Sequence, residues 1–151
     1  MRMASMVLGT ALSMGALQSA QADQEVFDLT NRLYRDECGS CHVAYPPPLL
    51  PKAPWQAIMA GLDKHFGTDA TLDAKAAKQI QAYLEANAGR RRMRGKPPVR
   101  ITETPWFREE HDEVPASAWK SPAVKSAANC GACHAQADTG DYSEGTLRVP
   151  R

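Results

Sequence analysis

All four cysteines of the 151-residue chain lie in two copies of one short pattern, Cys-x-x-Cys-His. The copies are CGSCH at 38–42 and CGACH at 130–134. This pattern is the attachment motif of c-type haem. Two thiols at this spacing bond to one side of a porphyrin, and the imidazole that follows lies beneath the iron. Two complete copies predict two covalently bound haem c groups. The predicted attachment residues are Cys38, Cys41, Cys130 and Cys133, with His42 and His134 as proximal ligands.

Three other uses of paired cysteines are less favoured. Two local disulfides do not explain the histidine that follows each second cysteine. A zinc site usually keeps its two pairs roughly 15–20 residues apart, and these pairs are much further apart. A thioredoxin-like redox pair needs a βαβ context, which this sequence lacks. Haem attachment therefore remains the prediction.

The chain has only two further histidines, His65 and His111. His65 lies 23 residues after His42, and His111 lies 23 residues before His134. We therefore predict His65 as the distal ligand of the first haem and His111 as that of the second. A crossed assignment, with His65 at the second haem and His111 at the first, stays open.

Methionine is the main rival as an axial ligand. Met59 shares a helical face with Ile58 and Leu62, which favours a role in packing. Met93 lies within the basic run RRRMRGK at 90–96. A segment with so many positive charges is unfavourable next to a haem iron, so Met93 is not favoured as a ligand. That run is interpreted as a linker with a solvated face. Pairing with haem propionates and docking on an acidic partner are its functional alternatives.

The first 22 residues resemble a secretory signal peptide. Arg2 precedes an apolar stretch at 6–17, and Ala20-Gln21-Ala22 has the pattern of a cleavage site. A signal peptide of this kind would direct export to the periplasm, an oxidising compartment, and would be cleaved after Ala22. A membrane anchor is the alternative, but the apolar stretch is short and no charged stop follows it. We expect no stable membrane span.

The charge balance argues against nucleic acid as the main partner. The chain has 18 Lys and Arg residues against 17 Asp and Glu residues, a formal net charge of +1. Such a balance provides no strong field to attract a polyanion.

Apolar periodicity and capping residues predict an all-α fold with extended Pro-rich loops. Helices are expected at about 25–37, 54–66, 72–88, 104–111 and 121–128, with an extended segment at 44–51. In the second helix the apolar face ends in His65, and Gly67 is the expected stop. Thr104 and Pro105 are expected to start the fourth. We predict two small haem-binding lobes, residues 23–95 and 96–151, after the signal peptide at 1–22.

Histidine on both faces of each iron would leave no open position for a substrate. This arrangement favours electron transfer over catalysis, and the absence of a methionine ligand predicts low reduction potentials. Two haems in so short a chain should lie close enough for electrons to pass between them.

Several stretches are more particular than the haem motifs: CGSCHVAYPPPLLP, WQAIMAGLDKHFG, RITETPWFREEHDEV, SAANCGACH and VPR. With them the chain resembles the small dihaem cytochrome c family often called DHC. The resemblance implies a periplasmic electron carrier with two bis-histidine haems, a first lobe similar to class I cytochrome c and a smaller second lobe. It also implies His42 and His134 as proximal ligands and His65 and His111 as distal ones. The implied partners are a membrane cytochrome b as donor and a small oxygen-binding c-type haem protein as acceptor.

Three other functions also involve haem. The chain could be the electron-transfer small subunit of a periplasmic reductase of the nitrate reductase type, which also uses two bis-histidine haems. A haem peroxidase or nitrite-reducing enzyme would need one haem with a labile or missing distal ligand. A haem-based gas sensor would need an attached output domain, for which the chain has no room.

Overall fold

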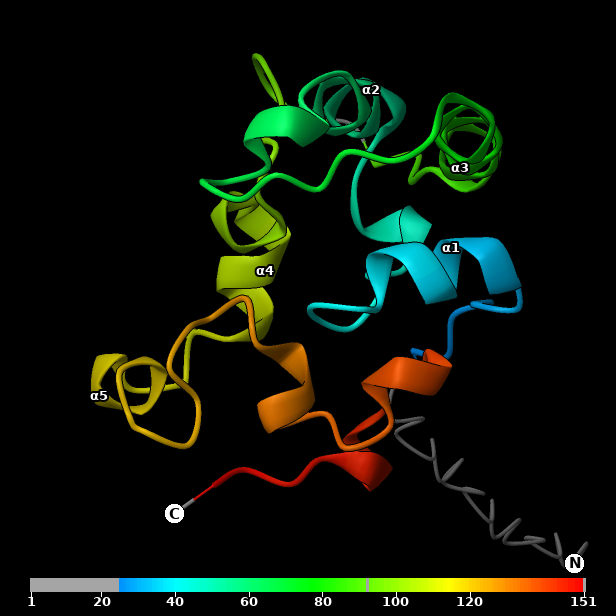
Figure 1. The fold of residues 1–151 in the computed structure, drawn as a ribbon. Coiled ribbons are helices and arrows are strands. Elements are labelled where there is room, and N and C mark those ends of the chain that lie inside the picture. The colour runs from blue at the N-terminus through cyan, green and yellow to red at the C-terminus, as the bar shows by residue number, and fades with distance from the viewer. Residues whose placement is uncertain (1–24, 92, 151) are drawn as a thin grey trace, which may run out of the picture.

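The computed structural model describes residues 25–91 and 93–150, and this part of the chain is all-α (Figure 1). Its α-helices are α1 (Arg32–Cys38), α2 (Lys52–Ala60), α3 (Ala74–Asn87), α4 (Pro105–Glu110) and α5 (Ala116–Trp119). The 3-10 turns are Pro47–Leu49, Leu62–Lys64, Ile101–Glu103, Cys130–Ala132, Ala137–Thr139 and Glu144–Thr146. Isolated bridges take the place of strands in these residues. The predicted signal peptide, 1–22, and Arg92 of the basic run lie outside the described residues.

The helices form two groups around the N-terminal motif. Helices α2 and α3 lie side by side, and α1 lies between this pair and the C-terminal segment (Figure 1). Helix α4 lies across from α1 in this view (Figure 1). In the part that the structure describes, no helix is both long and apolar enough to cross a membrane.

One hydrophobic core joins the N-terminal helices to the region around α4. Its buried residues are Leu29, Tyr34, Ala44, Leu50, Trp55, Ile80, Leu84, Ile101 and Phe107. Ile101 and Phe107 come from beyond the predicted lobe boundary at 95/96, so packing crosses that boundary. The boundary itself stays a prediction.

Helix α3 matches the predicted third helix closely. The Asp73 side chain accepts hydrogen bonds from the backbone N–H groups of Lys75 and Ala76, which caps the first turn. Ile80 and Leu84 are each 1% exposed, so the apolar face read from the sequence is the buried face. Local capping and periodicity are sufficient to specify this helix.

Helix α1 begins later than the sequence predicted. The expected helix from 25 is wrong up to Asn31, whose side chain caps α1 by accepting a hydrogen bond from the N–H of Tyr34. The segment before it pairs with the distant C-terminal part instead. The Phe27 N–H donates to the Gly140 carbonyl at 2.8 Å, and the Tyr142 N–H donates to the Glu25 carbonyl at 2.9 Å.

Helix α2 is shorter than the predicted helix at 54–66. It starts at Lys52 and ends at Ala60, because Gly61 leaves helical geometry with φ −125° and ψ 30°. A 3-10 turn at Leu62–Lys64 follows, and the Ala70 N–H then returns to the Leu62 carbonyl at 2.8 Å. His65 therefore lies after the helix rather than on its face.

The predicted extended segment at 44–51 contains a short 3-10 turn at Pro47–Leu49. The Trp55 Nε1–H donates to the Pro47 carbonyl at 2.8 Å, which ties this turn to α2. Tyr45 and Leu50, from either side of the turn, reach the cavity described below.

The start of α4 was predicted and the helix at 121–128 was not found. The Thr104 side chain accepts a hydrogen bond from the Phe107 N–H, with Pro105 in the first turn. The segment at 121–128 forms turns, and Lys125 adopts a left-handed conformation with φ 68° that interrupts any helix. Helix α5 lies ahead of it, where the sequence analysis expected none.

Candidate haem-binding sites

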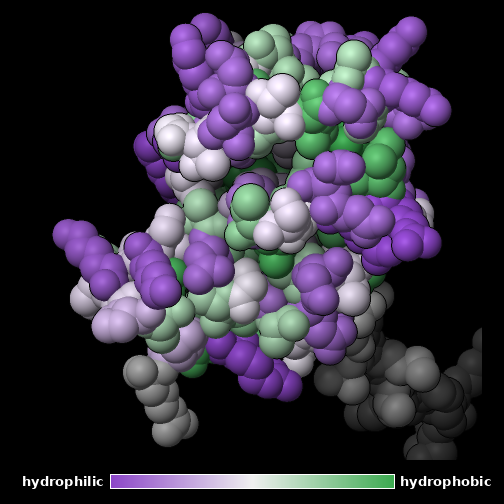
Figure 2. All heavy atoms as spheres, in the orientation of Figure 1, coloured by the Kyte–Doolittle hydropathy of each residue, from purple (hydrophilic) through white to green (hydrophobic). Residues whose placement is uncertain are grey.

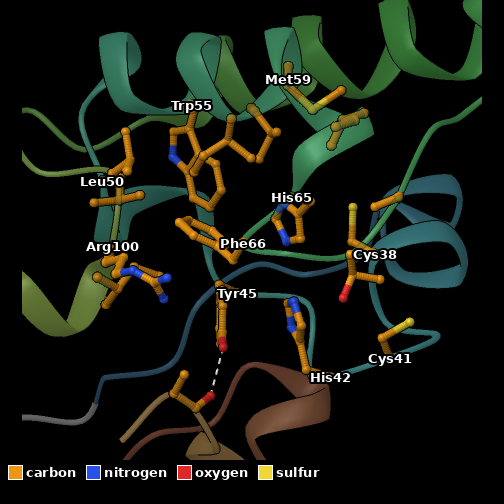
Figure 3. A pocket seen from close by; sticks show the side chains of 18 of the residues that line it. Cys38, Cys41, His42, Tyr45, Leu50, Trp55, Met59, His65, Phe66 and Arg100 are labelled. Atoms are coloured by element: carbon orange, nitrogen blue, oxygen red, sulfur yellow. Dashed lines mark hydrogen bonds between the residues drawn. The ribbon is translucent and has the colours of Figure 1, made fainter.

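A cavity of about 550 Å³ lies between the N-terminal motif and α2 (Figure 3). This volume is in the range of cofactor sites, about 300–1,000 Å³. Cys38, Cys41, His42 and His65 all line it, so the structure brings together the residues predicted for the first haem. Figure 2 shows hydrophilic side chains over much of the surface and hydrophobic ones in the recess beneath α2.

The imidazoles of His42 and His65 face each other across this cavity. Their ring centres are 6.3 Å apart and the ring planes differ by 20°. Two metal–imidazole bonds of about 2 Å, plus roughly 1 Å from nitrogen to ring centre on each side, place such rings about 6 Å apart. The separation thus fits one metal atom between the two rings.

The backbone orients the His42 ring for this role. Its Nδ1 lies 2.8 Å from the Val43 carbonyl oxygen. When Nδ1–H donates to that carbonyl, Nε2 is the nitrogen left to bind a metal. The Tyr45 ring stacks on the imidazole at 4.6 Å with an interplanar angle of 18°.

A second pair of imidazoles has nearly the same separation. The ring centres of His111 and His134 are 6.2 Å apart, with an interplanar angle of 72°. The His111 Nδ1 lies 2.8 Å from the Phe107 carbonyl oxygen, again leaving Nε2 free. The Phe107 ring stacks on His111 at 4.1 Å, and the Trp119 ring packs against His111 at 5.8 Å. The structure therefore places His65 by His42 and His111 by His134.

Two buried polar atoms at the second site have no hydrogen-bond partner among the described residues. They are the Nδ1 of His134 and the hydroxyl of Tyr142, and the two rings are 5.0 Å apart. Buried polar atoms are normally satisfied. Unpartnered polar atoms beside a motif that attaches haem fit a site that binds a further group.

Burial favours the neutral form of the His65 and His134 imidazoles. It lowers the pKa of His65, with smaller effects from His42 and from the positive charge of Arg100. It likewise lowers the pKa of His134, where His111 adds to the effect and the Tyr142 backbone opposes it. A neutral ring is the form that binds a metal.

The buried thiols of Cys38 and Cys130 differ from those of catalytic cysteines. Burial raises the pKa of Cys38 to about 11, and burial also raises that of Cys130 to about 11. A reactive redox thiol instead has a lowered pKa. The four cysteines are not joined in disulfides. Both observations fit thiols that carry a cofactor better than a thioredoxin-like pair or local disulfides.

The two sites share a wall. Cys130 of the second motif and Phe107, which stacks on His111, both line the cavity of the first site. The Tyr45 hydroxyl donates to the Ala128 carbonyl at 2.7 Å, just before the second motif. Groups bound at the two sites would therefore lie next to each other.

Two attachment motifs, each with a pair of facing imidazoles, define a c-type cytochrome with two haem sites. The family model for dihaem cytochrome c matches residues 34–142. The chain belongs to the dihaem cytochrome c family and carries two covalently bound haem c groups.

Solved structures agree with this assignment. A diheme cytochrome c from Rhodobacter sphaeroides is 42% identical, with a TM-score of 0.70 over 78% of this chain and 99% of the other. A diheme cytochrome c from Shewanella baltica is 40% identical, with a TM-score of 0.71 over 80% of this chain and 93% of the other. Among curated protein sequences, none matches the chain.

Three residues near the sites were not found by sequence reasoning. Tyr142 packs on His134, Trp119 packs near His111, and Arg100 lines the first cavity. Each comes from a segment for which no haem role was predicted. The tail after His134 folds back so that the Arg148 N–H donates to the Cys133 carbonyl at 2.7 Å. An aromatic residue shortly after a haem motif was the one available signal for Tyr142.

Proposed function

We propose that this protein carries electrons through two bis-histidine haems. His42 and His65 would hold the first iron, and His134 and His111 the second. The separations of 6.3 Å and 6.2 Å between the paired ring centres support this ligand set over the crossed one. When bound, each haem supplies an iron that changes its charge by one electron.

The ligand set decides between electron transfer and catalysis. Imidazoles on both faces leave no position for oxygen, peroxide or nitrite. Met59 lines the first cavity and also packs against the core, which is the packing role expected from its helical face. Histidine in place of methionine as the sixth ligand gives a lower reduction potential. Both haems would therefore be low-potential electron carriers rather than enzymatic centres.

The shared wall supports electron passage inside the molecule. Cys130, which would attach the second haem, also borders the first cavity, so the two haems would lie next to each other. Phe107 contacts the second site's His111 and lines the first cavity, where its ring excludes water. An electron could enter at one haem and leave from the other without crossing solvent.

The cellular setting is proposed from the sequence. Export by the segment at 1–22 would place the protein in the periplasm. The family resemblance points to a membrane cytochrome b as donor and a small oxygen-binding c-type haem protein as acceptor. Capture of partners from native periplasm and membrane fractions tests this part. Recovery in a stable complex with a large reductase subunit would instead indicate the reductase-subunit alternative.

Carbon monoxide tests the ligand set directly. The purified protein should contain two haems per chain, and its reduced spectrum should be unchanged by carbon monoxide. A carbon monoxide complex at one haem would overturn the bis-histidine proposal and favour a peroxidase-like enzyme. A haem count of one would contradict the use of both motifs.

A further inference from the structure

Arg100 occupies a distinct position in the first site. Cys38 and Cys41 lie on one side of the facing imidazoles, and Arg100 lies on the opposite side (Figure 3). Among the described residues that line this cavity, Arg100 is the only lysine or arginine. In a c-type haem the vinyl groups that bond to cysteine and the two propionates lie on opposite sides of the ring. Arg100 therefore stands where the propionates of the first haem would be.

The guanidinium is held in place by an aromatic ring. Its central carbon lies 4.1 Å from the centre of the Phe66 ring. The Phe66 ring in turn packs edge-on against the His65 ring at 4.9 Å. This stacking leaves the edge of the planar guanidinium, with its N–H groups, available to an acceptor.

The backbone of Phe66 is unusual in a way that serves this contact. Its φ is 48°, a left-handed conformation that is uncommon for a residue other than glycine. The side chain is also 46% exposed despite its size. Unfavourable conformations of this kind concentrate at functional sites. Here the turn directs Phe66 toward both the distal histidine and Arg100.

Arg100 has weak competition for its hydrogen bonds. Its carboxylate neighbour Glu103 forms an ion pair with it, but the Glu103 Oε1 lies 3.7 Å from Nε, beyond hydrogen-bond distance. The acidic residues that line the cavity are Glu37 and Asp69. Glu37 adjoins Cys38, on the attachment side. Asp69 is bound to its neighbour Thr71, whose hydroxyl donates to it at 2.6 Å.

We propose that Arg100 binds a propionate of the first haem through its guanidinium, and that Phe66 holds the guanidinium in that position. The inference rests on the proposed occupancy of the first site by a haem between His42 and His65. Arginine matches a carboxylate with two parallel hydrogen bonds, which makes this pairing both strong and specific.

Reduction potentials provide the test, measured by spectroelectrochemical titration of the intact two-haem protein. A cation beside the haem disfavours the extra positive charge of oxidised iron. Arg100→Gln should therefore shift one of the two midpoint potentials downward and leave the other unchanged. Arg100→Lys keeps the positive charge but loses the planar guanidinium and its two parallel hydrogen bonds. It should therefore shift the same midpoint by less. Arg94→Gln, in the basic run, is the matched control and should move neither.

A second variant assigns the shifted midpoint to a haem. His111→Met should raise the midpoint of the second haem, since methionine raises a haem potential. The midpoint lowered by Arg100→Gln should be the other one. Unchanged midpoints in Arg100→Gln, or a shift confined to the second haem, would overturn the proposal.

Infrared difference spectra give an independent readout. With haem labelled by carbon-13 at the propionate carboxyls, the redox-induced carboxylate bands should shift in Arg100→Gln and stay in place in Arg94→Gln. A purely packing role on Phe66 predicts equal effects of Lys and Gln at position 100 and unshifted carboxylate bands. Carbon monoxide binding by the unmodified protein would instead be a failure of the ligand set, so the two proposals fail in different ways.

Discussion

The hydroxyl of Tyr45 donates a hydrogen bond to the backbone carbonyl of Ala128 at 2.7 Å. Its ring meanwhile stacks on His42. One side chain thus contacts a predicted axial ligand of the first haem and the loop that leads into the second motif. Tyr45 therefore connects the two haem sites directly.

Tyr45→Phe should keep the stacking and remove the hydrogen bond. A neutral hydrogen bond contributes about 0.5–1.5 kcal/mol, and leaving the Ala128 carbonyl unpaired adds to the loss. We expect the free energy of unfolding to fall by about 1–2 kcal/mol, measured by urea denaturation of the two-haem protein. Tyr83→Phe is the control, since its hydroxyl makes a longer bond of 3.2 Å to the Asp28 carbonyl. An equal or larger loss in the control would contradict the role given to Tyr45.

Replacing a distal histidine should open one iron without detaching its haem. His65→Ala and His111→Ala each leave both pairs of cysteines in place, so mass spectrometry should still find two haems. The reduced variants should each bind one carbon monoxide per chain, and the double variant two. If His65→Ala and the unmodified protein have identical carbon monoxide spectra, the assignment of His65 is wrong.

Gly140 should not tolerate a side chain. Its φ is 90°, and a Cβ there would overlap the backbone oxygen of Phe27. We expect Gly140→Ala to cost about 2 kcal/mol or more, through strain and disruption of the pairing between segments 25–27 and 140–142.

Gly145→Ala is the matched control, because a Cβ at that position meets nothing within 4 Å. Thermal unfolding followed at the haem absorbance compares the two variants. Similar midpoints for both would mean that the docking of the tail matters little to stability.

Glu85 links α3 to α2 and predicts a pH dependence. Hydrogen bonds from Lys52, Gln81 and Gln56 lower its pKa from 4.5 to about 2. A lowered carboxyl pKa adds stability above pH 4.5, and this contribution is lost as the pH falls toward 2. Glu85→Gln should therefore be slightly less stable than the unmodified protein at pH 7, by a small margin because the site faces solvent.

Urea unfolding of Glu85→Gln and of the unmodified protein is measured from pH 7 into the acid range. The difference in urea midpoint between Glu85→Gln and the unmodified protein should shrink below pH 4.5. Asp36→Asn, which removes the exposed pair between Arg32 and Asp36, serves as the control and should have less effect. A difference that stays constant down to pH 2 would exclude Glu85 as its source.

The sequence was most informative where structure depends on neighbours along the chain. Asp73 and the spacing of Ile80 and Leu84 predicted α3, and the Thr104–Pro105 pair predicted the start of α4. The paired histidines could also be found, because the cysteine motifs and the small number of histidines left few choices.

Long-range contacts explain the errors. The pairing of 25–27 with 140–142 overrides the apolar periodicity before Asn31. No sequence pattern near either segment predicts that they pair. Arg100 has no local signal either, since its position depends on how the chain returns to the first site after α3. Gly61 and Lys125 ended predicted helices through backbone conformations that side-chain periodicity does not encode.

The wall of the first cavity includes residues 99–102 and Phe107, which follow the basic run. A single-haem fragment cut at residue 95 would therefore expose an unfinished porphyrin pocket to water. An engineer seeking a minimal one-haem carrier from this chain would have to retain the segment through α4 and discard the second attachment motif by point substitution rather than by truncation.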